Sequence, residues 1–96
     1  MLQRKDIIER LAKKGYTKKD SGVIIDDFLR VILEALVDGE SVNLHGFGTF
    51  EVRTMSPRKT HNIQTGAPID IPAFRKPKFT AGKLLKRSIR EGYIQD

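Results

Sequence analysis

The cationic side chains are the residues of this sequence whose types and placement could do chemistry, and they gather in one half of the chain. The 96 residues carry a formal net charge of +6. Residues 1–52 hold eight Lys and Arg against nine Asp and Glu, whereas residues 53–96 hold ten against three. A basic half attached to a nearly neutral half is typical of a protein that binds a polyanion, and nucleic acid is favoured over an acidic membrane. The alternative is a charged surface that serves solubility alone.

No group of residues has the spacing of a catalytic or metal site. His45 and His61 are not at ligand spacing with each other or with a carboxylate, and no Ser or Thr lies in a nucleophile turn. Asp26 and Asp27 are adjacent in an expected helix, where neighbouring side chains point about 100° apart. We therefore expect a binding protein that is not an enzyme and that uses no cofactor, metal or small-molecule substrate.

The stretch over residues 53–72 predicts a long β-hairpin arm. It holds few large apolar side chains, and it reverses at residues 62–66, where Asn62 and Gly66 favour a turn. Short runs with the alternation of strands lie on either side, at residues 51–53 and 69–71. A two-stranded ribbon is barely stable by itself in water. Its order must come from the body at its base or from a partner that lies along it.

Apolar periodicity predicts two helices before the arm, at residues 4–14 and about 18–37. Apolar side chains surround most of the second helix, so it must be buried on several sides. A chain of this size with no cysteine has neither a large core nor a disulfide to help it. We expect a second copy to cover this helix, with a dimer core that contains Phe28, Ile32, Leu36, Leu44, Phe47, Phe50 and Phe79.

The remaining elements complete an α+β fold in one domain over residues 1–96. Strands are predicted at residues 41–44 and 73–79, and a last helix follows from about Gly82 to Gly92. We divide the domain into a helical dimerisation base (1–40), a sheet with the arm (41–81) and a C-terminal helix (82–92). No apolar run reaches the length of a signal peptide or a membrane span, so we expect a soluble, intracellular protein without a membrane partner.

The sequence resembles the HU and integration host factor family, the histone-like DNA-bending proteins of bacteria and some of their viruses. The similar pieces are residues 46–53, Arg58-Lys59, Asn62, residues 64–66, Ile71-Pro72-Ala73, Gly82-Lys83 and Leu85-Lys86. The resemblance covers nearly the whole chain in the family's order of elements. It implies an intertwined dimer with a three-stranded antiparallel sheet, whose two protruding arms embrace double-stranded DNA in the minor groove. It also implies a cytoplasmic, nucleoid-associated protein.

The resemblance also implies which residues contact DNA. Side chains of the arm would line its DNA-facing side, and Lys83 and Lys86 would meet phosphates flanking the bend. Thr80 and the amides that open the last helix are additional phosphate donors. The expected DNA-contacting residues are Arg53, Arg58, Lys59, His61, Asn62, Ile63, Gln64, Arg75, Lys78, Thr80, Lys83 and Lys86.

Three departures from the family pattern bear on function. The arm tip carries Ile63 where the family usually has a proline, which acts as a wedge between base pairs. Isoleucine belongs to the same class of apolar wedges, so we expect Ile63 to kink DNA, with a weaker or differently shaped kink. The alternative is that Ile63 only caps the hairpin. Thr60 and His61 replace a common Gly-Arg, so the arm loses a permanent charge there. Phe74 and Lys76 also depart from the pattern.

The expected function is architectural: the dimer binds the minor groove largely without sequence specificity and bends or compacts DNA. One alternative is a site-preferring bender like integration host factor. Another is a non-catalytic interaction module whose arm adds a strand to a partner's sheet, which the absence of acidic residues between Arg53 and Ile69 disfavours. RNA binding stays open, although the arm lacks aromatic residues for base stacking. The sequence also leaves open whether the partner chain is identical or a paralogue.

Overall fold

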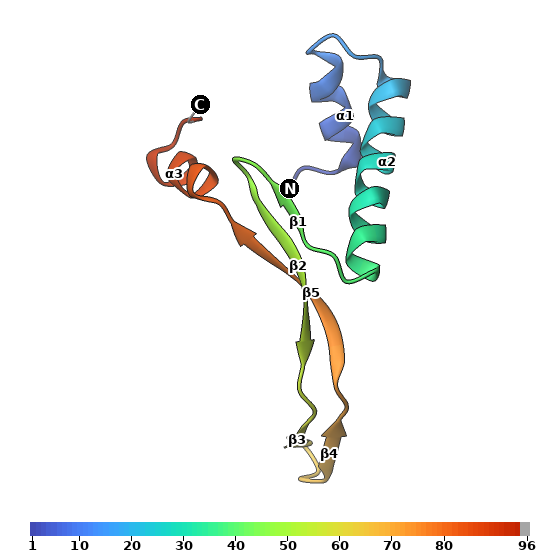
Figure 1. Ribbon diagram of the computed structural model, residues 1–96, viewed down its shortest axis with the longest axis vertical. Coiled ribbons are helices and arrows are strands. Elements are labelled where there is room, and N and C mark those ends of the chain that lie inside the picture. Colours follow the sequence, from blue (N-terminus) through green and yellow to red (C-terminus); the bar gives the residue numbers. More distant parts are fainter. Residues whose placement is uncertain (95–96) are drawn as a thin grey trace. The chain divides into compact units, whose positions relative to one another are not determined.

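A computed structural model of the protein describes residues 1–94 (Figure 1). Its elements in chain order are α1 (Arg4–Ala12), α2 (Lys18–Val37), β1 (Val42–Leu44), β2 (Gly48–Met55), β3 (Arg58–His61), β4 (Pro68–Ile71), β5 (Phe74–Ala81) and α3 (Lys83–Glu91). The chain divides into two compact units, one covering Met1–Glu34 and the other beginning at Ala35. The predicted α+β class is confirmed, with its two N-terminal helices, its three-stranded antiparallel sheet, its hairpin and its C-terminal helix.

Each helix of the N-terminal unit has a hydrogen bond that caps its N-terminus. The backbone N–H of Gln3 donates to the Asp6 carboxylate at 2.8 Å, which opens α1. The Thr17 hydroxyl accepts the backbone N–H of Asp20 at 3.0 Å, and this bond caps α2. α1 ends two residues earlier than predicted, because Lys14 N–H bonds back to the Leu11 carbonyl at 2.9 Å in a tighter turn.

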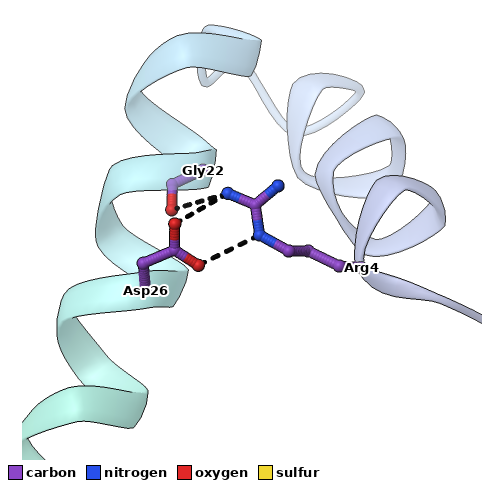
Figure 2. A network of polar contacts seen from close by, with 3 residues as sticks. All are labelled: Arg4, Gly22 and Asp26. Atoms are coloured by element: carbon purple, nitrogen blue, oxygen red, sulfur yellow. Dashed lines mark hydrogen bonds and ion pairs between the residues drawn. The ribbon is translucent and has the colours of Figure 1, made fainter.

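An ion pair joins the two helices of this unit (Figure 2). The Arg4 guanidinium donates from Nε and Nη2 to the two carboxylate oxygens of Asp26, at 3.0 Å and 2.8 Å. Arg4 also reaches the Gly22 carbonyl at 3.4 Å, across a backbone that has no side chain to obstruct it. These hydrogen bonds lower the pKa of Asp26. The pair therefore stabilises the unit at neutral pH, modestly because it is exposed, and that contribution is lost as the pH falls through the lowered pKa.

Two of the three antiparallel ladders in the second unit share one register. β2 lies between β1 and β5 in a three-stranded sheet, and β3 pairs with β4 in a separate two-stranded sheet (Figure 1). Met55 pairs with Phe74 at the end of the β2–β5 ladder, and Arg58 pairs with Ile71 at the start of the β3–β4 ladder. Two residues on each strand lie between these pairs. The arm thus continues the β2–β5 ribbon without a shift in register.

Three aromatic rings on and next to the three-stranded sheet contact one another. The Phe79 ring is 4.8 Å from Phe50 and 5.7 Å from Phe47, measured between centroids. Gly82 follows β5, and its N–H bonds to the Phe47 carbonyl at 2.8 Å. A Cβ added at Gly82 would lie 3.3 Å from that oxygen. Glycine therefore permits the close approach between the turn that precedes β2 and the start of α3.

The apolar side chains of this single chain are not enclosed. Among the described residues no hydrophobic side chain is fully buried. Phe28 of α2 is 49% exposed, and Phe47 and Phe79 are 48% and 42% exposed. A fold of this size needs a continuous apolar core. The chain therefore leaves three of the predicted core residues open to solvent, while Ile32, Leu36, Leu44 and Phe50 are half-buried. No helix within residues 1–94 is both long and apolar enough to cross a bilayer.

Candidate nucleic-acid interface

The β2–β5 ladder sorts its side chains onto two faces. Successive residues of a strand point to opposite sides, and directly paired residues share a side. Phe50 and Phe79 are paired and in ring contact, which identifies the inner face. The opposite side, which we call the outer face, carries Thr49, Glu51, Arg53, Met55, Phe74, Lys76, Lys78 and Thr80.

Three cations lie together on the outer face. Arg53 is paired with Lys76, and Lys78 is the next outward-facing residue along β5, opposite Glu51. None of the ion pairs found within residues 1–94 involves these cations. Arg53 and Lys78 were expected to contact DNA, whereas Lys76 was not. The period of two along β5 could have identified Lys76, because residues 76, 78 and 80 must share a face.

Arg75 is not brought together with these cations. It lies on the inner face, paired with Thr54. Its Nη2 donates to the backbone carbonyls of Leu36 and Val37, at 3.1 Å and 3.0 Å. These carbonyls belong to the last turn of α2, where positive charge is favoured, and the Leu36 carbonyl also accepts the backbone N–H of Gly39 at 3.0 Å. The structure thus uses this guanidinium to tie β5 to the end of the helix.

The arm carries basic side chains on both of its faces. In the β3–β4 ladder Lys59 is paired with Asp70, and His61 with Pro68. Arg58 alternates with them and lies on the other side. Arg58, Lys59 and His61 are all exposed. A ribbon with cations on both sides can meet negative charge on both sides, as it would between the two phosphate chains that border a groove of DNA.

The arm tip is a hydrogen-bonded turn that presents an apolar side chain. The Asn62 side-chain oxygen accepts the backbone N–H groups of Gln64 and Thr65 at 2.8 Å and 3.2 Å. Gly66 has a φ of +71° and donates its N–H to the Asn62 carbonyl at 2.7 Å, so the predicted turn chemistry is present. Ile63 stands at the tip with its side chain fully exposed, at 101%. No part of the described chain covers it.

The start of α3 supplies a second basic group. Lys83 and Lys86 lie three residues apart and therefore on neighbouring positions of one helix side, and both are exposed. The N-terminus of this helix carries no acidic residue in its first turn, so its free amides are available to an anion. Thr80 lies on the outer face of β5, two residues before Gly82. The described residues contain no group of His, Asp or Glu side chains that could hold a metal ion.

Comparison with known proteins agrees with this geometry. The sequence model of the family described as bacterial DNA-binding protein matches residues 2–90. The chain is 48% identical to DNA-binding protein HU of Thermotoga maritima over 90 residues, which are 93% of this chain and all of that protein. It is 43% identical to HU of Staphylococcus aureus over the same shares.

Solved structures give the same result for the fold. The Anabaena HU–DNA cocrystal structure superposes with a TM-score of 0.83 at 36% identity, over 93% of this chain and 97% of that one. HU from Thermotoga maritima superposes with a TM-score of 0.65 at 36% identity, over 92% and 98%. The resemblance seen in the sequence is therefore confirmed, and this chain belongs to the HU family of bacterial DNA-binding proteins.

Proposed function

We propose that this protein is an architectural DNA-binding protein of the nucleoid. It binds double-stranded DNA in the minor groove largely without sequence specificity, and it bends the duplex as a dimer. The observation that supports this most strongly is the arm itself: a narrow ribbon with cations on both sides that ends in the fully exposed Ile63. The cocrystal of the Anabaena relative with DNA supports the choice of partner.

The dimer follows from the open apolar surfaces. Soluble monomers rarely expose a large continuous apolar patch, because removing such surface from water is favourable. Phe28, Leu29 and Val31 of α2 are 49%, 57% and 64% exposed, and no apolar side chain of residues 1–94 is fully buried. A second identical chain that covers α2 and the inner face would supply the missing core. The core of that dimer comprises Phe28, Ile32, Leu36, Leu44, Phe47, Phe50 and Phe79.

Affinity comes first from phosphate neutralisation. Arg53, Lys76 and Lys78 of the outer face, with Lys83 and Lys86 of α3, present charges that no acidic partner neutralises in an ion pair among the described residues. Each phosphate they contact releases condensed counterions, so the logarithm of the affinity falls with the logarithm of salt concentration by about 0.9 per phosphate. This term does not depend on base sequence.

Sequence tolerance follows from the groove that the arm enters. The minor groove shows nearly the same acceptors for A·T and T·A pairs, so polar groups there discriminate little between sequences. Arg58, Lys59 and His61 supply donors along the arm, and Asn62 keeps its side-chain N–H groups free while its oxygen serves the turn. Preference should then follow how easily a duplex deforms, with flexible or nicked DNA bound best.

Bending comes from Ile63. An apolar side chain that enters a base step partly unstacks it, at a cost of a few kcal/mol, and kinks the duplex. Bent DNA reaches more of the protein surface, and those added contacts offset the cost. The tip has no apolar neighbour in the described chain with which it could pack instead.

The first test measures the end-to-end distance of a duplex labelled with a dye at each end. The ends should approach as the protein binds at moderate salt, and duplexes of unrelated sequence should behave alike. Ile63→Ala should reduce the bend severalfold while most of the affinity remains, because it removes the wedge and no charge. Ile63→Pro is the matched variant, which restores the residue usual in the family and should bend at least as strongly as the parent.

Binding that leaves the ends unmoved would reject the architectural role and leave a basic surface that coats DNA. An Ile63→Ala variant that bends the duplex as the parent does would show that the tip only caps the hairpin. Strong preference for one duplex sequence over others would favour the site-preferring alternative.

A further inference from the structure

Two prolines face each other where the β2–β5 ribbon continues into the arm. Because the register is unchanged between the two ladders, Pro57 lies opposite Pro72. A proline has no N–H to donate to a ladder, so this position cannot form cross-strand backbone hydrogen bonds in either direction. The strands are accordingly interrupted here, between Met55 and Arg58 on one side and between Ile71 and Phe74 on the other (Figure 1).

The proline pair extends an apolar surface along the outer face. Pro57 lies two residues after Met55 and Pro72 two residues before Phe74, in the interval where no ladder forms, and the alternation of β2 and β5 carried on into this interval would put the prolines on the side of Met55 and Phe74. Phe74 is 46% exposed, and both prolines are exposed as well. These four residues, which we call the apolar stripe, lie outside the aromatic cluster of the inner face. The proposed function gives these four residues no role, and Phe74 is one of the residues that depart from the family pattern.

Cations border the apolar stripe at both ends. The pair of Arg53 and Lys76 directly precedes the pair of Met55 and Phe74 on this face. Beyond the prolines comes Lys59, paired with Asp70. Pro57 and Pro72 share a surface depression of about 500 Å³ with the residues that follow and precede them in the arm, which are Arg58, Lys59, Asp70 and Ile71. The stripe is thus an apolar interval within a mainly basic surface.

We propose that the apolar stripe is a second DNA-contacting surface, which packs against the deoxyribose faces of a bound duplex. The proposal rests on the proposed function. The cations at the two ends of the stripe would contact phosphates. The deoxyribose sugars between those phosphates would then place their C–H groups against the stripe. Removing both apolar surfaces from water is favourable and does not depend on base sequence. The stripe would therefore add affinity without adding phosphate contacts.

The charges around the stripe favour DNA over a second copy of the chain as its occupant. A second copy would need acidic groups to meet Arg53, Lys76 and Lys59 at the same time. Residues 53–96 of a second copy hold three Asp and Glu against ten Lys and Arg, and residues 1–52 hold nine against eight, so neither half carries a marked excess of negative charge. DNA offers negative charge on both sides of an apolar sugar surface.

The experiment measures the affinity of a short duplex for the full-length protein by fluorescence anisotropy at several salt concentrations. Phe74→Gln removes the ring and leaves the charge unchanged. It should weaken binding about tenfold at every salt concentration, as expected for exposing roughly half of a Phe side chain in the complex. The slope of log affinity against log salt should stay that of the parent, because the same phosphates remain neutralised. Phe74→Leu, which keeps an apolar side chain, should retain most of the affinity.

A matched control lies outside the arm and the outer face. Ile94 follows α3 and is 83% exposed. Ile94→Gln removes a comparable apolar group and should leave the affinity near that of the parent. Thermal unfolding of each variant, with its dimerisation measured by light scattering, shows whether the folded dimer is retained.

Each result decides the proposal. Affinity of Phe74→Gln equal to that of the parent would overturn it and leave the proposed function standing. Equal losses in Phe74→Gln and Ile94→Gln would overturn the assignment to the outer face. Loss of the dimer in Phe74→Gln, with DNA affinity per dimer unchanged, would assign the stripe to a second copy instead. A parent protein that fails to bind any duplex would reject the proposed function itself.

Discussion

At the scale of single residues, neighbouring cations in β5 have opposite roles. Arg75 caps the carbonyls of Leu36 and Val37, whereas Lys76 faces outward beside Arg53. The sequence identifies both as basic residues in a strand of the basic half, and that is why Arg75 was expected at the interface. Which of the two faces outward depends on the register with β2, and composition carries no information about register.

Charge removal at these two positions should therefore have separable effects. Arg75→Gln should lower the free energy of unfolding by about 1 kcal/mol, because two helix-end carbonyls lose a charged donor. Its salt slope for DNA binding should equal that of the parent. Lys76→Gln should leave stability nearly unchanged and reduce the salt slope by about 0.9 for each phosphate that is no longer neutralised. Denaturant unfolding and salt-dependent anisotropy measure the two quantities, and a reduced salt slope in Arg75→Gln would return this residue to the interface.

At the scale of elements, the sequence predicted the helices and the arm correctly because their signals are local. The apolar period of α2, the Thr17 cap and the Asn62–Gly66 turn each act within a few residues. The pairing of Pro57 with Pro72 depends on the register between distant strands, and it was not predicted. The same is true of the contact between β2 and β5 at Gly48, which brings two backbones together.

Gly48 is required by that contact. A Cβ added there would lie 2.5 Å from the Thr80 carbonyl oxygen and 2.6 Å from the Phe79 ring, closer than real contacts allow. Gly48→Ala should therefore force β2 and β5 apart and lower the free energy of unfolding by roughly 2 kcal/mol, within the range for overpacked sites. Ser56→Ala, an exposed site in the interval between strands, is the control and should change stability by less than about 0.5 kcal/mol. Denaturant titration compares them, and equal stability of the two variants would contradict the steric argument.

At the scale of the whole molecule, the proposed dimer would make stability depend on association. A single chain leaves Phe28 of α2 half exposed, and the described residues enclose no apolar side chain. If folding and dimerisation are coupled, mass action makes the melting temperature rise with protein concentration. The sequence predicts such a partner from the apolar circumference of α2, and it predicts which side chains the partner would cover. It does not predict how the two chains would be oriented, because a single chain's pattern does not fix the geometry of an interface.

A charge placed in the proposed dimer core should show whether folding and dimerisation are coupled. Phe28→Glu should lower the melting temperature by several degrees at a given concentration, because burying an unpaired carboxylate is costly. It should also shift the species seen by light scattering toward the monomer. Ile94→Glu is the control: Ile94 is 83% exposed and lies beyond the residues 2–90 that match the family, so the same charge there should be tolerated. A melting temperature of the parent protein that does not change over a hundredfold range of protein concentration would mean that the single chain folds without a partner. The exposed apolar side chains of α2 would then need another role.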